Sequence, residues 1–248
     1  MRHSLVVFLC FMIIAIVPPA HARELSVYCE YPAPKDGDLY GGRLIYEQVW
    51  ELLRRAGFDT QIETVSWKRG YAEALIRADV ALFPTTFTKE REPLFHWIGP
   101  ILEVEWAFFA HADSGISVNS LEEAKAVKSI GTYAQDSKEV WLKNHGFNNL
   151  VSVLDNITNL KKLYEGRIDL MVGSPGVTDN WPAEHGYDSS KMVTAFKFNT
   201  VKLYFAVSKE TSKETVSALR SAFDSMRKDG TIDAIYHQWA PGWLPPKD

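Results

Sequence analysis

Cysteine is scarce in this sequence of 248 residues, which contains only Cys10 and Cys29. Cys10 lies in an N-terminal segment that we expect to be removed, so Cys29 would remain alone and no intramolecular disulfide would form. Metal-ligand spacing is also lacking, because the later histidines are scattered along the chain: His96, His111, His145, His185 and His237. We therefore expect no metal site, and we expect the hydrophobic core to supply the stability.

The sequence also lacks the short motifs of several enzyme classes. It contains no P-loop, no G-x-S-x-G motif and no dinucleotide-binding fingerprint, and no pair of acids is marked out for acid–base catalysis. Positive charge is not in excess, since 31 acidic residues outnumber 27 Lys and Arg residues and the formal net charge is -4. We therefore predict a protein that is not an enzyme, uses no cofactor and does not bind nucleic acid.

The first 22 residues have the pattern of a secretory signal peptide. Met1-Arg2-His3 is positively charged, residues 5–17 are almost all apolar, and Ala20-His21-Ala22 matches the small-x-small rule for cleavage. The apolar stretch is too short for a membrane-spanning helix, and no later stretch is long and apolar enough. We expect export and cleavage after about Ala22. An uncleaved anchor and lipidation of Cys10 are the alternatives.

The spacing of apolar residues predicts alternating strands and helices in the first part of the chain. They are expected at residues 25–28 (strand), 45–53 (helix), 61–65 (strand), 67–75 (helix) and 80–83 (strand). In an open α/β sheet, the residues that follow the strands gather at one rim. Tyr31, Trp67 and Arg91 each follow a predicted strand, so we expect them to share a site. Burial in the core is the alternative for Trp67.

Residues 84–91, Pro-Thr-Thr-Phe-Thr-Lys-Glu-Arg, follow the third of these strands. They place small hydroxyls near a guanidinium, whose planar set of donors matches a carboxylate. We interpret the segment as a carboxylate-binding site in which Arg91 is joined by Thr86 and by Thr85 or Thr88. A turn capped by Thr88, with its charges solvated, is the alternative interpretation.

In its motifs and their order, the chain resembles the family 3 solute-binding proteins of the bacterial periplasm, the polar amino-acid-binding type that serves ABC importers. The matching motifs are Tyr31-Pro32-Ala33-Pro34, Gly41-Gly42 before the first helix, Ser66-Trp67-Lys68-Arg69 and Thr86-Phe87-Thr88-Lys89-Glu90-Arg91. The resemblance implies a type II α/β fold, with two Rossmann-like lobes joined by a two-strand hinge. It also implies that Arg91 binds the ligand's α-carboxylate, with Thr86 as hydroxyl partner and Tyr31 and Trp67 as pocket walls.

The second half of the chain predicts a further α/β lobe, with strands at residues 129–133 and 150–154. Ser120-Leu121-Glu122-Glu123 is a capping box that opens a helix. Gln135-Asp136-Ser137 lies where another helix begins, and the N–H groups of such a helix start attract anions unless an inward-pointing Asp136 opposes them. We therefore count Ser137 among the candidate ligand-binding residues.

Ser174 marks a departure from the family pattern. Residues 167–174, Arg-Ile-Asp-Leu-Met-Val-Gly-Ser, resemble a family strand whose end usually supplies a carboxylate to the ligand's ammonium. A serine cannot replace that carboxylate, because an unpaired buried charge is costly. Either another acid, such as Glu30 or Asp136, takes its place, or the ligand is not an ordinary α-amino acid. Asp179 and Trp181 follow, and we expect a surface helix there rather than cleft residues.

The last part of the chain predicts a return to the first lobe, with two more strands, two amphipathic helices and a proline-containing tail that is not a regular helix. The two strands are expected at residues 196–198 and 202–207. We expect the following division: lobe 1 at residues 23–105 and 201–248, lobe 2 at residues 106–200, and hinge crossovers near residues 104–108 and 199–203.

These patterns favour a monomeric periplasmic protein that captures a small carboxylate-bearing solute, an amino acid or a related compound, between two closing lobes. Its expected partner is an ABC permease. Two alternatives use the same scaffold. One is an exported enzyme that resembles cyclohexadienyl dehydratases, which the lack of an identifiable catalytic acid disfavours. The other is a sensor that presents its loaded form to a membrane signalling receptor.

Overall fold

A computed structural model describes residues 24–34 and 41–247. The expected signal peptide, including Cys10, lies outside these residues, as does the part of the first loop at 35–40. The strands that the structure describes form one eight-stranded sheet in the order β2-β1-β3-β8-β4-β7-β5-β6. Within the described residues, no helix combines the length and the apolar character that crossing a membrane requires.

The N-terminal part alternates strands and helices, as the sequence predicts. Its elements are β1 (Ser26–Cys29), α1 (Gly41–Ala56), β2 (Ile62–Thr64), α2 (Trp67–Ile76) and β3 (Val80–Thr86). β1 pairs in parallel with β2 on one side and with β3 on the other. The helix α1 begins at Gly41, so the two glycines lie within its first turn and not before it. It ends ahead of Gly57, whose φ of 80° favours a glycine.

The strand β3 is longer than predicted. We expected it to end at residue 83 because Pro84 has no N–H to donate to a neighbouring strand. The structure continues it to Thr86 through a register shift between Leu82 and Thr85 in its antiparallel pairing with β8. The irregularity accommodates the proline, and the pairing of Thr85 with Tyr204 and of Thr86 with Leu203 then carries β3 further toward the middle of the molecule.

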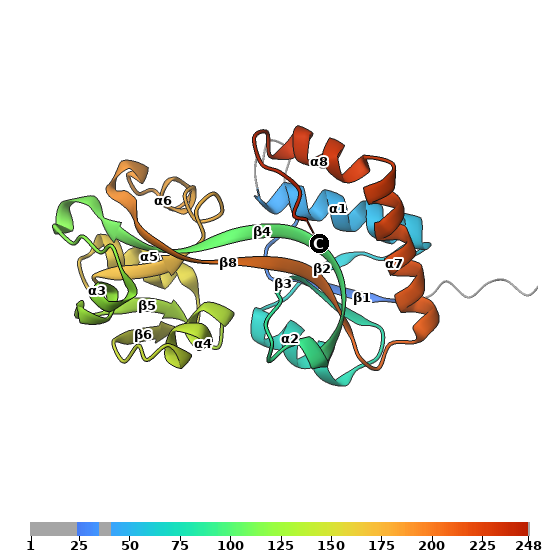
Figure 1. The fold of residues 1–248 in the computed structure, drawn as a ribbon, viewed down its shortest axis with the longest axis horizontal. Helices are drawn as coiled ribbons and strands as arrows, with labels where there is room; N and C mark the ends of the chain where they lie inside the picture. Colours follow the sequence, from blue (N-terminus) through green and yellow to red (C-terminus); the bar gives the residue numbers. More distant parts are fainter. Residues whose placement is uncertain (1–23, 35–40, 248) are drawn as a thin grey trace, which may run out of the picture.

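Two long antiparallel strands, β4 (Phe95–His111) and β8 (Met192–Ser208), run between two bodies (Figure 1). The two separate strands that we predicted at residues 196–198 and 202–207 are therefore wrong, because β8 is continuous. Polar residues interrupt the apolar pattern there, yet Asn199 and Thr200 still pair with Trp106 and Glu105 of β4. Register shifts on either side of Ala107 bend the ladder without ending it.

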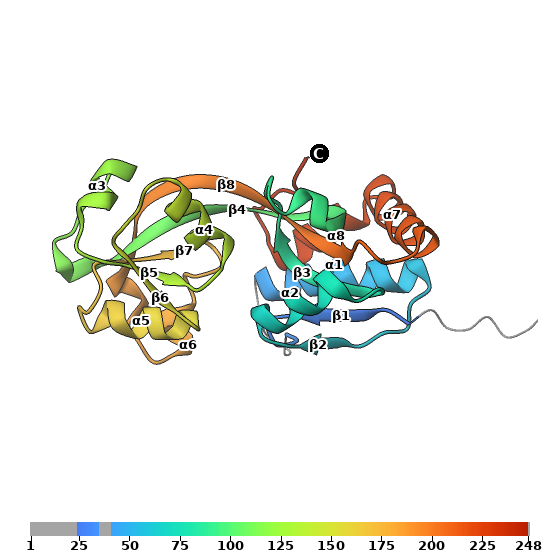
Figure 2. The same cartoon turned by 90° about the horizontal axis from the view of Figure 1, so that it is seen from below.

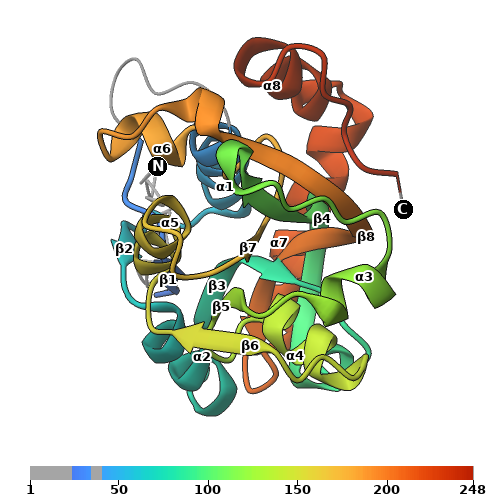
Figure 3. The same ribbon diagram turned by 90° about the vertical axis from the view of Figure 1, so that its left-hand side faces the viewer.

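The second body contains α3 (Leu121–Ala126), β5 (Ile130–Tyr133), α4 (Ser137–Asn144), β6 (Leu150–Val153), α5 (Asn156–Tyr164), β7 (Leu170–Gly173) and α6 (Trp181–Glu184). The predicted cap of α3 is confirmed, since the Ser120 hydroxyl accepts the Glu123 N–H. Figures 2 and 3 show α3 and α4 on one side of the β5–β6–β7 sheet and α5 and α6 on the other. This arrangement covers both faces of a parallel sheet, as such sheets require.

Both bodies have a core on each face of the sheet, because alternate residues of a strand point to opposite faces. In the first body, α1, α7 (Lys213–Lys228) and α8 (Thr231–Trp239) cover one face and α2 covers the other. In the second body, Phe108 packs with α3 and α4, whereas its neighbours Ala107 and Phe109 pack with α5. Short 3-10 turns complete the chain at Glu92–Leu94, Ala112–Ser114 and Ser189–Lys191.

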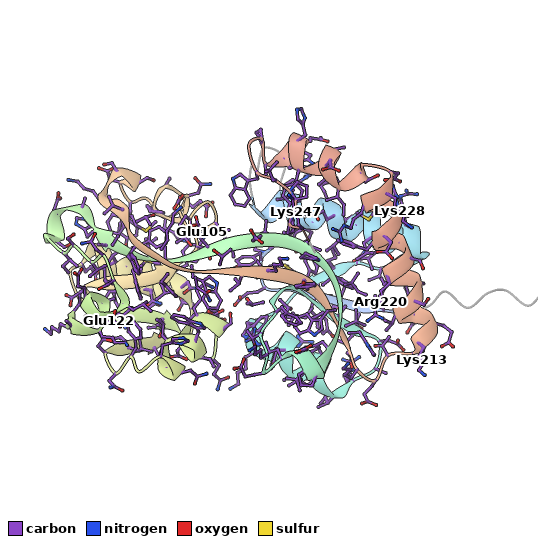
Figure 4. All side chains as sticks on the ribbon, viewed as in Figure 1. Glu105, Glu122, Lys213, Arg220, Lys228 and Lys247 are labelled. Carbon is purple, nitrogen blue, oxygen red and sulfur yellow. The ribbon has the colours of Figure 1, made fainter. Side chains whose placement is uncertain are left out.

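The lobe boundaries that we predict fall inside the two connecting strands. Glu105 of β4 pairs with Thr200 of β8, so the two boundaries lie opposite each other on one ladder. Figure 4 places Glu105 on the stretch of β4 between the two bodies. We retain residues 23–105 with 201–248 and residues 106–200 as the proposed lobes, and the strands that join them as the proposed hinge.

Candidate ligand-binding cleft

A cleft lies between the two bodies, with an empty volume of about 1510 Å³ that includes its open mouth. Its walls come from the ends of strands in both bodies, as expected for an open α/β sheet. The first body contributes Glu30, Tyr31, Trp67, Phe83, Pro84, Thr86 and Arg91, and the second contributes Thr132, Tyr133, Asp136, Lys138, Ser174, Thr178 and Trp181. Five of the six candidate residues therefore line one space, and Ser137 does not.

Arg91 is buried, with 8% of its surface exposed, yet it lines the cleft. Its Cζ lies 5.1 Å from the ring centroid of Trp67 and 5.2 Å from that of Tyr71. Its Nη1 is 3.5 Å from the Thr86 carbonyl oxygen. No carboxylate in the described part of the chain forms an ion pair with it. A buried guanidinium without an acid is costly to maintain, and a bound carboxylate offsets that cost.

The hydroxyls near Arg91 have different positions from those expected. The Thr85 hydroxyl is fully buried and donates to the Leu82 carbonyl, so it faces away from the cleft. The Thr88 hydroxyl accepts the main-chain N–H of Arg91. The capped turn that we considered as an alternative is therefore present, and it holds the backbone of Arg91 while the side chain faces the cleft. Of these threonines only Thr86 lines the cleft.

Ser137 lies behind Thr86 and not in the cleft lining. Its hydroxyl donates to Thr86 Oγ1 at 3.1 Å, and only 4% of the residue is exposed. This hydrogen bond connects β3 of the first body to the first residue of α4 in the second. The N-cap of α4 is Asp136, whose carboxylate accepts the Lys138 N–H. The carboxylate thus occupies the helix start that we expected to attract an anion.

Aromatic side chains from both bodies form much of the cleft wall. Tyr31 is 37% exposed and sits on the loop after β1, while Trp67 is half-buried at the start of α2. Trp67 also packs against the core beneath α2, so both interpretations of this residue apply. On the opposite side, Trp181 begins α6 and lines the cleft, which corrects its assignment to a surface helix alone. Asp179 is exposed and accepts the Gly176 N–H, outside the lining.

Ser174 follows β7 and lines the cleft, with 7% of its surface exposed. Its main-chain N–H donates to the Thr178 hydroxyl at 2.9 Å. The Thr178 side chain also packs against Gly173, where a Cβ would lie 2.6 Å from Thr178 Oγ1. Ser174 and Thr178 therefore bring hydroxyls to this part of the cleft, and position 174 lacks the acid that the resemblance places there. Glu184, an exposed residue of α6, also lines the cleft.

Two more acids, Glu30 after β1 and Asp136 at the N-cap of α4, also line the cleft. Glu30 is half-buried, and it accepts a hydrogen bond from the Tyr133 hydroxyl of the second body. Burial, followed by the nearby Asp136 charge, raises the pKa of Glu30, although the Tyr133 hydroxyl, the nearby main-chain N–H of Trp67 and the charge of Lys138 act in the opposite direction. Asp136 is paired with Lys138, whose Nζ is 3.4 Å from its Oδ1.

Sequence reasoning did not identify Tyr133, Lys138 or Trp106, all of which line the cleft. Tyr133 is the last residue of β5, so the strand-end rule that found Tyr31 applies to it as well. Trp106 is 1% exposed in an apolar strand and has the pattern of a core residue. Lys138 extends to within 5.7 Å of the Trp106 ring centroid, a contact that no sequence pattern predicts. No group of three or more His, Cys, Asp or Glu residues in the described ranges is placed to hold a metal ion.

Comparison with known proteins gives one matching family and many similar structures. Residues 35–242 match the family model described as bacterial extracellular solute-binding proteins, family 3. A curated relative, the amino-acid-binding protein AabA of Dichelobacter nodosus, is 23% identical over 167 residues, which cover 66% of this chain and 65% of the relative. The match thus spans just under two thirds of that relative's length.

Two solved structures illustrate the similarity in fold. A histidine kinase sensor domain with similarity to periplasmic binding proteins has a TM-score of 0.78 and 18% identity, and the match covers 90% of this chain and 98% of that one. The amino acid ABC transporter substrate-binding protein AbpA of Streptococcus pneumoniae, bound to L-arginine, has a TM-score of 0.70 and 17% identity, with 87% and 93% covered. The predicted two-lobed α/β fold is confirmed.

Proposed function

Because this chain belongs to the bacterial extracellular solute-binding proteins, family 3, we propose that its solute is a small carboxylate-bearing compound, an amino acid or a close relative. The observation that carries the proposal is Arg91, a buried guanidinium that faces the cleft and has no acidic partner among the described residues. A carboxylate supplies the missing charge and matches the planar donors of the guanidinium.

The other candidate residues have supporting roles in this proposal. Thr86 offers a hydroxyl beside Arg91, and Ser137 orients that hydroxyl through its hydrogen bond. Tyr31 and Trp67 enclose the apolar part of the solute, and Ser174 offers a neutral hydrogen-bonding group from the second lobe. Closure about β4 and β8 brings the two walls together, excludes water and strengthens the charge interaction at Arg91.

The proposed setting is the periplasm, after removal of the signal peptide, with delivery of the solute to an ABC permease by a monomer. The relative AabA is named an amino-acid-binding protein and AbpA a substrate-binding protein of an amino acid ABC transporter, and both names agree with this setting. A membrane partner can distinguish the loaded protein from the empty one if the two differ in the arrangement of their lobes. Mass determination of the N-terminus of exported protein tests the cleavage after about Ala22.

We propose that the cleft binds without catalysis. The rival activity, a dehydratase-like elimination, predicts turnover of prephenate or arogenate by the purified protein, and detectable turnover would contradict the proposal. The sensor role shares the same binding step and differs only in the membrane partner. Genes for a permease and an ATPase beside this gene favour import, whereas a membrane kinase or cyclase gene favours sensing.

Isothermal titration calorimetry with the common amino acids and small organic acids tests the binding proposal. We expect at least one carboxylate to bind to the wild-type protein and to lose affinity in Arg91→Ala. Arg69→Ala is the matched control, because Arg69 lies on α2, is exposed and pairs with Glu73. Binding that is unchanged in Arg91→Ala would contradict the assignment of the carboxylate site.

A further inference from the structure

The C-terminal segment, residues 241–247, follows the last helix of the first body and has no regular secondary structure. Figure 1 shows it returning from α8 toward the long strands β4 and β8. At its end, the Lys202 ammonium of β8 donates a hydrogen bond to the Lys247 carbonyl. The segment therefore runs from the outer helices of the first body to the strands that join the two bodies.

Trp243 of this segment meets a loop of the second body at Gly176. A Cβ at Gly176 would lie 2.3 Å from Trp243 Cζ2 and 2.8 Å from Trp243 Cη2, so the edge of the indole ring lies directly on the glycine backbone. Trp243 also packs against the main hydrophobic core of the first body, and so does Val177, the next residue of the loop. The second body is thus attached to the first at two neighbouring residues.

The loop that Trp243 contacts, residues 174–178, is part of the cleft wall. Four of its residues line the cleft, namely Ser174, Gly176, Val177 and Thr178, whereas Trp243 lies outside the lining. The main-chain N–H groups of Val177 and Thr178 both donate to the Ser174 carbonyl, so the loop is a compact turn. A contact that fixes Gly176 therefore also fixes the position of Ser174 in the cleft.

We propose that the C-terminal segment is a strap between the two bodies, in which Trp243 sets the solute affinity from outside the cleft by holding the loop at residues 174–178 against the first body. Trp243 is then a positioning residue, because it acts on the solute only through that loop. The effect on affinity rests on the proposed function, whereas the effect on the arrangement of the two bodies does not.

The strap stabilises the arrangement in which the two bodies meet. The contact between Trp243 and Gly176 forms only while the loop lies against the first body, so its free energy favours that arrangement alone. A solute held between the bodies requires the same arrangement, and its apparent Kd rises as the fraction of free protein in that arrangement falls. Loss of the strap therefore weakens all solutes by one common factor, whatever charges they carry.

Distances between spin labels test the arrangement of the bodies without a solute. The labels are placed at Glu122→Cys of α3 and Lys228→Cys of α7, two exposed positions that Figure 4 shows in different bodies. Cys29 is fully buried and does not compete for the label. Electron resonance of the free, folded protein should give one main distance in the wild type and an additional distance in Trp243→Leu, whose side chain still packs on the core but is too short to reach Gly176.

Two further variants complete this measurement. Trp243→Phe keeps an aromatic ring and should give a smaller effect in the same direction, so it decides the question if Trp243→Leu does not fold. Leu244→Ala is the matched control, because Leu244 belongs to the same segment and is 84% exposed. It should leave the label distances unchanged. Melting of each variant checks the fold. Wild-type distances in both folded Trp243 variants would overturn the proposal.

Calorimetry with L-arginine, L-phenylalanine and pentanoate tests the effect on affinity. We expect Trp243→Leu to raise the Kd of each probe that binds by the same factor, about three- to thirtyfold, the scale of burying part of an aromatic ring. A variant that melts earlier but keeps wild-type distances and affinities would show that Trp243 only stabilises the first body, and would overturn the strap. If no probe binds to the wild-type protein, the proposed function is contradicted, and the label distances still decide whether the strap exists.

Discussion

Replacement of Arg91 by methionine separates binding from stability. In the free protein the guanidinium contacts the rings of Trp67 and Tyr71 and has a long contact to the Thr86 carbonyl. Methionine keeps the length of the side chain and can pack against both rings through its sulfur. It also removes a buried charge that no acid among the described residues neutralises. The variant therefore loses the carboxylate site while most of the packing remains.

The two free energies have different expected sizes. Removing one member of a buried hydrogen-bonded charge pair costs about 2–5 kcal/mol, and about 1.4 kcal/mol corresponds to a tenfold change in affinity, so carboxylates should bind roughly 30-fold to several thousandfold more weakly. Each cation–π contact contributes about 0.5–2 kcal/mol, and a sulfur–aromatic contact restores about 0.3–1.5 kcal/mol. We expect the free energy of unfolding of the free protein to change by no more than about 1 kcal/mol.

Calorimetry and urea unfolding of the free protein measure the two quantities independently. Arg91→Lys should give an intermediate affinity, because lysine keeps the charge and loses the planar pair of donors. Arg69→Met is the control on the same face of the first body. An Arg91→Met variant that binds the carboxylate within threefold of wild type, or one whose affinity falls only because the free protein is unfolded, would refute the assignment of the carboxylate site to Arg91.

Three further predictions concern the C-terminal tail, the loss of stability at acid pH and the contact between the two bodies. Gly176→Ala should destabilise the protein in urea unfolding by at least about 1–2 kcal/mol, the cost of a left-handed alanine, because Gly176 has φ 80° and a Cβ would lie 2.3 Å from Trp243 Cζ2; no change would contradict the contact. The pKa of Glu51 is lowered from 4.5 to about 2, chiefly by hydrogen bonds from Arg54. The stability advantage of wild type over Glu51→Gln should therefore persist above pH 4.5 and shrink as the pH falls toward about 2. A stability difference that stays constant with pH would contradict this prediction. Tyr133→Phe should weaken solute binding about five- to tenfold by removing one hydrogen bond across the cleft, and an affinity equal to wild type would show that this contact does not support closure.

Much of the first lobe could be predicted from the sequence because its signals are local. The strand-end rule placed Tyr31, Trp67 and Arg91 on one rim, and all three line the cleft. The prediction for β3 was wrong at its end, since Pro84 signals a stop only if the neighbouring strand needs its N–H. The antiparallel partner β8 resumes pairing after a register shift, which depends on a segment more than 100 residues away.

The contribution of the second lobe was harder to predict, because it depends on how the bodies meet. Ser137 occupies a helix start that favours anions in isolation, yet its hydroxyl turns to Thr86 across the cleft. Tyr133 becomes a site residue only because Glu30 lies opposite it. The sequence around Trp181 is typical of a surface helix, but the position of α6 places Trp181 in the cleft wall. Contacts between lobes have no local sequence signature.

The long strands β4 and β8 also determine the order in which the chain can fold. Each of the two pairs with the other, and β8 inserts between β3 and β4 in the sheet. The first body therefore lacks its central strand until residues 192–208 are available, whereas the elements from α3 to α6 are contiguous in the chain. Closing such a large loop before its contacts form is slow. We expect the second body to acquire structure first. A chain that ends before residue 192 should leave β3 without its neighbouring strand β8, and therefore with an open edge.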